Sequence, residues 1–118
     1  MGFGQGQDSL DLAGRKSLTE LKATKVAVKK AYDMEKIKAK QIEVAEVHDC
    51  FTIAEIMAIE DLGFFAKGAG GKATLAEKTT HSGKIVINPS GGLKAGGHPV
   101  GATGIKQIAY LAKLIEEN

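Results

Sequence analysis

The sequence lacks the features that hold small secreted chains together or anchor a chain in a membrane. Its single cysteine, Cys50, excludes an internal disulfide. No apolar run approaches the roughly 18 residues that a membrane-spanning helix needs, and no secretory signal peptide is recognisable. One cysteine and no signal peptide together favour a cytoplasmic protein without a membrane span.

The charge balance excludes another class of partner. The formal net charge is only +2, and no dense block of lysine and arginine interrupts the sequence, so we expect no nucleic-acid binding. With 43% hydrophobic and 25% charged residues, the composition is that of a globular chain. The 118 residues fit one domain or a large piece of one.

Glycine is abundant and clustered, at 15 of the 118 residues. Four glycines fall within residues 1–16, where neither helical nor strand periodicity is visible. We therefore expect residues 1–16 to be an irregular loop.

Helix and strand signals alternate after this loop. Ser17 and Glu20 are spaced as a capping box, which predicts a helix over about residues 18–34. Residues 42–47 are short and β-branched, which predicts a strand. The following apolar segment has no polar face, which predicts a buried helix that stops at Gly63.

The second half follows the same alternation. Residues 63–83 are expected to form a long loop, residues 85–87 a buried strand and residues 103–116 a helix. The apolar stripe expected on that last helix consists of Ile105, Ile108, Ala109, Ala112 and Ile115. The order helix, strand, helix, strand, helix indicates a layered α/β arrangement.

The segment His48-Asp49-Cys50-Phe51 joins the first strand to the buried helix and allows two interpretations. In the first, Cys50 is an acid/base or nucleophile at the helix start, with His48 beside it. In the second, Asp49 caps the helix, Cys50 is a small buried residue and His48 is a turn residue. Thr52 and Glu55 also fit a capping box, so Thr52 is an alternative cap.

A glycine-rich stretch over residues 91–104 contains the third candidate, His98, directly before Pro99. Such glycines let the backbone approach a ligand closely, or cradle a phosphate at a helix start. The alternative is a tight turn with close helix–strand packing. It is not a Walker loop, because no Gly-Lys-Ser/Thr follows the glycines.

A metal site is the third possibility for the nitrogen and sulfur ligands of the chain. Their spacings match no zinc signature, so we expect no metal. The ligands in question are His48, Cys50, His81 and His98. His81, within the expected loop, is interpreted as a surface residue.

HDCF at 48–51, followed by GGLKAGGHPVGATG at 91–104, resembles the thiolase superfamily. The likeness is greatest to archaeal and bacterial thiolases of the sterol-carrier-protein type, and it covers nearly the whole chain. It implies a layered αβαβα fold, a mixed sheet with helices on both faces, incomplete at both ends. Residues 1–118 are then part of a thiolase C-terminal domain, with 1–16 as a loop and 17–118 as a helix-strand-helix-loop-strand-helix core.

The resemblance also implies a reaction. Thiolases such as acetyl-CoA acetyltransferases make or cleave a carbon–carbon bond between acyl-CoA thioesters, through an acylated cysteine and without a permanently bound cofactor. Their substrates are acetoacetyl-CoA or 3-ketoacyl-CoA, in lipid or isoprenoid metabolism. By this likeness His98 activates the nucleophilic cysteine and stabilises an oxyanion, His48 completes an oxyanion hole, and Cys50 performs acid/base work.

The family's nucleophilic cysteine belongs to an N-terminal domain, and no second cysteine is present in these residues. The isolated chain is therefore expected to be inactive. Implied partners are the missing N-terminal thiolase domain, further subunits in a homodimer or tetramer, and a hydroxymethylglutaryl-CoA synthase complex. The main alternative is a degenerate thiolase-like module that binds acyl-CoA or lipid without turnover. A phosphate-binding fold unrelated to thiolases is a third hypothesis.

Overall fold

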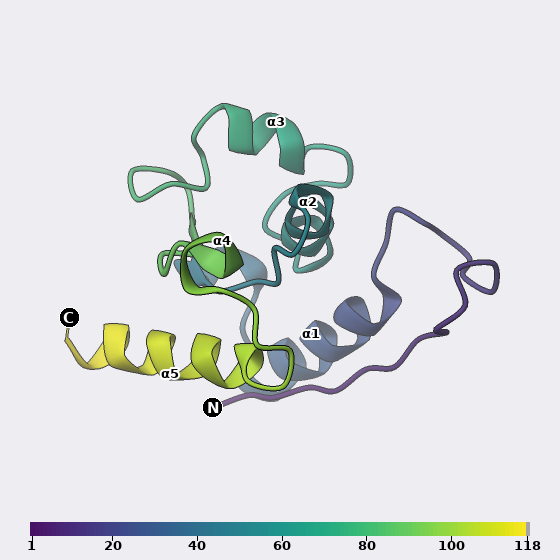
Figure 1. Cartoon of the computed structure of the whole chain (residues 1–118), viewed down its shortest axis with the longest axis horizontal. Coiled ribbons are helices and arrows are strands. Elements are labelled where there is room, and N and C mark those ends of the chain that lie inside the picture. Colours follow the sequence, from purple (N-terminus) through teal and green to yellow (C-terminus); the bar gives the residue numbers. More distant parts are fainter. Residues whose placement is uncertain (118) are drawn as a thin grey trace.

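The computed structural model describes residues 1–117. Along the chain the elements are α1 (Lys22–Glu35), a 3-10 turn η1 (Ala39–Gln41), β1 (Val44–Ala45), α2 (Thr52–Asp61), α3 (Gly70–Leu75), β2 (Val86–Ile87), α4 (Gly92–Gly96) and α5 (Thr103–Glu116). Figure 1 shows α2 and α4 at the centre, α3 above them, and α1 and α5 below. Within the described residues, no helix is long and apolar enough to cross a membrane.

The two strands pair in parallel, with Val44 opposite Val86 and Ala45 opposite Ile87. The structure therefore confirms an α/β chain, mostly helical with a small parallel sheet. The predicted strand over 42–47 was too long, because only two of its residues lie in the ladder.

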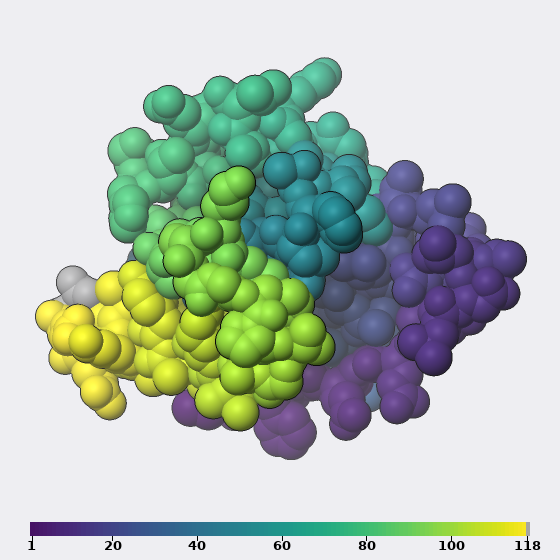
Figure 2. Space-filling model, in the orientation of Figure 1, coloured from purple at the N-terminus to yellow at the C-terminus, as the bar shows by residue number. Residues whose placement is uncertain are grey.

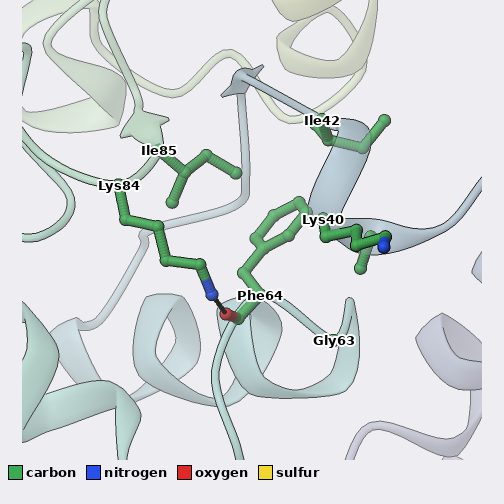
Figure 3. Close-up of a pocket in the computed structure, with 7 residues that line it drawn as sticks. Lys40, Ile42, Gly63, Phe64, Lys84 and Ile85 are labelled. Carbon is green, nitrogen blue, oxygen red and sulfur yellow. Dashed lines mark hydrogen bonds between the residues drawn. The ribbon is translucent and has the colours of Figure 1, made fainter.

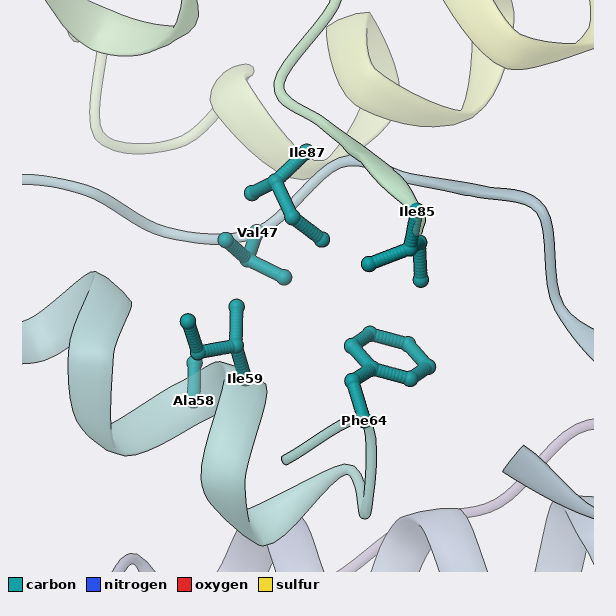
Figure 4. Packing of buried hydrophobic residues seen from close by; sticks show 6 residues of the cluster. All are labelled: Val47, Ala58, Ile59, Phe64, Ile85 and Ile87. Atoms are coloured by element: carbon teal, nitrogen blue, oxygen red, sulfur yellow. The ribbon is translucent and has the colours of Figure 1, made fainter. Parts of the chain in front are cut away.

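The core lies between this sheet and α2. Ile59 is fully buried and Val47, Ile85 and Ile87 are nearly so. Figure 4 shows these side chains and Phe64 converging on one centre. The cluster takes Ile87 from β2, Ile85 and Val47 from the residues next to the two strands, and Ala45 of β1 packs partly buried against it, so burial favours the close approach of the two strands to α2.

The predicted start of the first helix was wrong. Ser17 caps no helix: its hydroxyl accepts a hydrogen bond from Thr19 N at 3.2 Å. α1 begins four residues later than expected, at Lys22. The N–H of Leu21 donates instead to Asp61 Oδ2 on α2, at 2.6 Å, so a carboxylate from a distant helix replaces the local cap.

α2 was predicted correctly in type and end point. It stops at Asp61, and Gly63 follows with a left-handed φ of +84°, as the stop signal requires. The helix is not buried all round, however: Ile53 on its first turn is 58% exposed. Its apolar first turn therefore faces outward.

The segment 63–83, predicted as a loop, contains α3. The glycines that suggested a loop lie at the helix start, where Gly70 N donates to Glu60 Oε1 at 2.8 Å. A Cβ at Gly70 would lie only 2.9 Å from that same oxygen. The helix thus depends on a contact with α2 that local sequence rules do not reveal.

Residues 1–16 contain no helix or strand, as expected, but they are not loose. The segment runs along α1 (Figure 1). From Gly2 to Gly6, every second residue is a glycine whose added Cβ would overlap a backbone carbonyl of that helix. The glycines are Gly2, Gly4 and Gly6, and the carbonyls belong to Ala31, Ala27 and Ala23 respectively. Small residues on both sides bring the two backbones close together.

α5 occupies the predicted residues, but its apolar stripe is not buried. Ile105, Ile108 and Ile115 are each more than 70% exposed. In Figure 2 the helix protrudes at one side of the molecule. A large exposed apolar face of this kind is typical of interaction surfaces.

Candidate active site

The structure brings two of the three predicted site residues into contact. The rings of His48 and His98 have centroids 4.8 Å apart and are inclined at 67°, an edge-to-face arrangement. His48 follows β1, and His98 lies between α4 and α5. Fifty residues of sequence separate them, so the contact depends on how the two loops are joined.

Two carboxylates join the loops. Asp49 accepts the N–H of Leu93 at 3.0 and 3.2 Å with its two oxygens. Glu46 accepts the N–H and the hydroxyl of Ser90, at 2.9 and 2.8 Å. Asp49 and Glu46 flank His48 in sequence, whereas Ser90 lies in the turn before α4 and Leu93 in the first turn of α4, which leads to His98. These charge-assisted bonds therefore set the spacing between the two histidines.

Asn88 adds a third connection. Its side-chain oxygen accepts the N–H of Val47 at 2.7 Å, and its amide nitrogen donates to Glu55 Oε2 at 3.0 Å. Its φ is +50°, in the left-handed region where asparagine is better tolerated than most residues. One side chain thus links the end of β1, α2 and the turn after β2.

The two halves of the glycine-rich stretch differ in how tightly they pack. A Cβ at Gly92 would overlap the Asp49 carboxylate, so the first part is a tight turn with close packing. A Cβ at Gly97 would meet nothing within 4 Å, although its φ of +70° still favours glycine. Around His98 the stretch therefore leaves open space beside the backbone, as a ligand-binding loop requires.

Cys50 is exposed and lies in the turn between His48 and α2. The interpretation of Cys50 as a small buried residue was wrong. It lines a hollow of about 620 Å³ together with Phe51, Glu55 and Lys94. Neither histidine lines that hollow, so the structure places Cys50 next to the histidine pair along the chain and on a different hollow.

Both local capping predictions for α2 were also wrong. Asp49 bonds the N-terminal turn of α4 rather than that of α2. Glu55 does not reach back to cap its own helix; it bonds Asn88. In each case the carboxylate accepts a hydrogen bond from an N–H group far away in sequence instead of one at the start of α2.

The pKa of Glu55 is shifted by burial and by its neighbours Asn88 and Asp49. Burial raises the pKa of its carboxyl, and the nearby Asp49 charge raises it further, while the hydrogen bond from Asn88 opposes both. A carboxyl in the hollow beside Cys50 therefore holds its proton more readily than an ordinary glutamate.

His81 is exposed in the segment between α3 and β2, as predicted. Among residues 1–117, no three histidine, cysteine, aspartate or glutamate side chains converge in a metal-binding group.

A separate small hollow of about 80 Å³ lies beneath the sheet (Figure 3). Ile42, Phe64 and Ile85 line it, and Lys84 closes one side by donating to the carbonyl of Phe64 at 2.9 Å. None of the site residues above lines it, and its apolar lining continues the core.

Sequence reasoning missed the residues that hold the site in place, namely Glu46, Asn88, Ser90 and Thr103. Asn88 and Ser90 belong to an Asn-Pro-Ser-Gly turn, which signals a turn but not its partners. Thr103 is 3% exposed, and its hydroxyl lies 2.7 Å from His98 Nδ1. The signal available in the sequence was a hydroxyl residue at the predicted start of the last helix, five residues after His98.

The fold and the paired loops define a thiolase-type C-terminal domain. Residues 4–117 match the family described as thiolase C-terminal domain-like, and the chain belongs to that family. An acetyl-CoA acetyltransferase of Methanocaldococcus jannaschii is 50% identical over 109 residues, covering 91% of this chain and 28% of the relative.

Other similar proteins agree with this assignment. An acetyl-CoA acetyltransferase of Methanothermobacter thermautotrophicus is 49% identical over 105 residues, or 89% of this chain and 27% of the relative. Human sterol carrier protein 2 is 46% identical over 90 residues, or 75% and 16%. The solved Ltp2-ChsH2(DUF35) aldolase shares the fold, with a TM-score of 0.70 at 22% identity over 78% of this chain and 25% of that one. The chain thus spans little more than a quarter of the archaeal relatives' length.

Proposed function

We propose that this chain supplies the C-terminal catalytic residues of a thiolase. The enzyme would catalyse Claisen condensation and thiolysis of acetoacetyl-CoA or a 3-ketoacyl-CoA, in lipid or isoprenoid metabolism. The observation that carries the proposal is the contact between His48 and His98, held by carboxylate bonds between their loops. Family membership and the archaeal acetyltransferases support it.

The chemistry assigns each residue a role. Condensation removes a proton next to a thioester carbonyl, so the site needs a base and donors aimed at the developing oxyanion. His98 takes the proton of the nucleophilic thiol and then donates to the thioester oxygen. His48 stands beside it as a second donor to an oxyanion. Cys50, exposed in the adjoining hollow, carries the proton to and from the substrate carbon.

The remaining parts come from outside these residues. The acylated cysteine belongs to the N-terminal thiolase domain, and residues 1–118 form part of the C-terminal one. With its partner domain the chain completes the layered αβαβα fold and its mixed sheet, and the exposed face of α5 becomes covered. A homodimer or tetramer, with hydroxymethylglutaryl-CoA synthase as a further partner, extends the proposal. The coenzyme A thioester is substrate, and no permanent cofactor takes part.

One observation favours a second function. The chain holds a single thiol, so these residues contain no pair of cysteines to divide nucleophile and acid/base work. A thiolase-like module that binds acyl-CoA or lipid without turnover fits that fact.

A chimera tests the two functions. The 109 residues aligned with the Methanocaldococcus jannaschii acetyltransferase replace the corresponding segment of that relative, which supplies the rest of the fold. We expect acetoacetyl-CoA thiolysis on addition of coenzyme A. His98→Ala and Cys50→Ala should each lower the rate by on the order of 10²–10⁴-fold, whereas His81→Ala, an exposed residue elsewhere, should leave it unchanged.

The outcome separates the hypotheses. A chimera with the circular dichroism and oligomeric state of the relative, but with acyl-CoA binding and no thiolysis, supports the binding module. Full activity in His98→Ala would remove the proposed role of the histidine pair.

A further inference from the structure

We propose that Thr103 is a positioning residue that fixes the tautomer of His98, with the proton on Nδ1 and the lone pair on Nε2. The inference rests on the proposed function only for its catalytic consequence. The tautomer itself is a property of this chain and is testable without turnover.

The geometry begins with the buried Thr103 hydroxyl. Thr103 is the first residue of α5 and is 3% exposed. Its Oγ1 lies 2.7 Å from His98 Nδ1 and donates its hydrogen to the Pro99 carbonyl at 3.1 Å. A hydroxyl has one hydrogen. Helical back-bonding favours assigning that hydrogen to the Pro99 carbonyl, and with this assignment the oxygen accepts from the ring and Nδ1 carries the proton.

The backbone holds both partners in register. The Pro99 carbonyl also receives the N–H groups of Ala102 and Thr103, at 2.8 and 3.0 Å, so the entry to α5 is fixed by the same oxygen. Back-bonding from a threonine to the carbonyl four residues earlier is a normal helical arrangement. Pro99 restricts the backbone of His98, which comes directly before it. The distance from Oγ1 to the ring is therefore set by two constrained segments.

The assigned tautomer suits the proposed reaction. With Nδ1 bonded to Thr103, Nε2 is the only ring atom that accepts a proton from a thiol. After it does so, Nε2–H is the donor available to an oxyanion. The opposite tautomer would present a donor where the reaction first needs a base. Thr103 acts only through His98 and does not itself touch the reacting atoms.

Nitrogen NMR of the 118-residue chain tests the assignment. The chain is labelled with ¹⁵N-histidine, and long-range ¹H–¹⁵N correlations distinguish protonated from lone-pair nitrogens. Resonances are assigned with His48→Gln and His81→Gln variants. We expect His98 to have pyrrole-type Nδ1 and pyridine-type Nε2 at a pH where the ring is neutral. Thr103→Ser should keep this pattern, and Thr103→Val should shift His98 toward a mixture of tautomers.

Thr79→Val is the matched control, since Thr79 is also buried, at 7% exposure, but bonds neither His98 nor Pro99 in the structure. It should leave the His98 tautomer unchanged. A wild-type His98 with its proton on Nε2 overturns the proposal, and so does an unchanged pattern in folded Thr103→Val. If Thr103→Val does not fold, the wild-type pattern decides alone.

The catalytic consequence is measured separately, in the chimera. Thr103→Val should lower kcat by on the order of ten- to a hundred-fold with little change in KM, and Thr103→Ser should restore most of it. Wild-type kcat in a folded Thr103→Val chimera contradicts the positioning role. A chimera inactive in every form speaks against the proposed function and leaves the tautomer result standing.

Discussion

Asn88 shows how much of the site depends on single side chains. It accepts from Val47 N and donates to Glu55, and both bonds are partly buried. Asn88→Ala leaves two groups without partners and places alanine in a left-handed conformation. We expect it to lower the free energy of unfolding by about 1–3 kcal/mol, measured by urea denaturation.

Asn88→Gly is the control for the backbone contribution. Glycine tolerates the φ of +50°, so this variant should be more stable than Asn88→Ala by about 1 kcal/mol. It still loses the side-chain bonds and should stay below wild type. Equal stability of Asn88→Ala and wild type would show that these bonds do not hold the loops together.

At the residue scale the sequence singled out residues that the structure brings together, but not the contacts that hold them; their chemical roles stay a prediction. His48, Cys50 and His98 were predicted from two motifs, and the two histidines do meet. Asp49 was assigned a capping role, but on the wrong helix. A carboxylate satisfies any free N–H equally well, so its partner depends on a tertiary arrangement that local spacing does not contain.

α2 carries two glutamates with opposite shifts, which gives a prediction at the scale of the element. Burial and then Asp49 raise the pKa of Glu55 above its usual 4.5. Such a group resists ionisation only in the folded state. Its contribution to stability is therefore complete below pH 4.5 and is lost as pH rises through the folded pKa. We expect Glu55→Gln to be more stable than wild type at pH 7, with no gain below pH 4.5.

Glu60 should behave in the opposite way. Burial favours its neutral form, but the N–H groups of Gly68 and Gly70 and the Lys67 ammonium outweigh it, so the pKa is held below 4.5. Its contribution is present above pH 4.5 and is lost as pH falls through the folded pKa. Glu60→Gln should be less stable than wild type at pH 7 and nearly equal at the lowest pH. Urea denaturation across pH 3–7 compares both variants, and parallel pH profiles would contradict this assignment.

Element prediction succeeded where one local signal dominated and failed where two elements share a contact. The predicted bounds of α5 were correct. The glycine-rich stretch with Pro99 stops before the helix, and a clear helical periodicity of apolar residues follows it. α3 was missed, since Glu60 of α2 bonds its first turn and Gly70 fits against that side chain. α4 was missed for the same reason: Asp49 bonds its N-terminal turn.

At the scale of the whole molecule, the exposed stripe of α5 predicts how the 118-residue chain behaves in solution. Large apolar surfaces left uncovered bind hydrophobic dyes and promote association. Ile108, which is 71% exposed, contributes to this surface. We expect Ile108→Gln to lower dye fluorescence and self-association, measured by sedimentation velocity.

Lys113→Gln introduces the same residue at an exposed position of the same helix and serves as the control. It should leave dye binding and sedimentation close to those of wild type. If Ile108→Gln also changes neither, then the stripe is not a sticky surface and needs no covering residues.

The central claim is that two loops fifty residues apart form one site through His48 and His98. A double-mutant cycle in the chimera tests it most directly, using His48→Ala, His98→Ala and both together in the acetoacetyl-CoA thiolysis assay. Residues that act as a unit lose activity non-additively. We expect the double variant to be little worse than the poorer single one, with a coupling of about 1–3 kcal/mol. Losses that simply multiply would show that the histidines act independently, and would contradict a shared site.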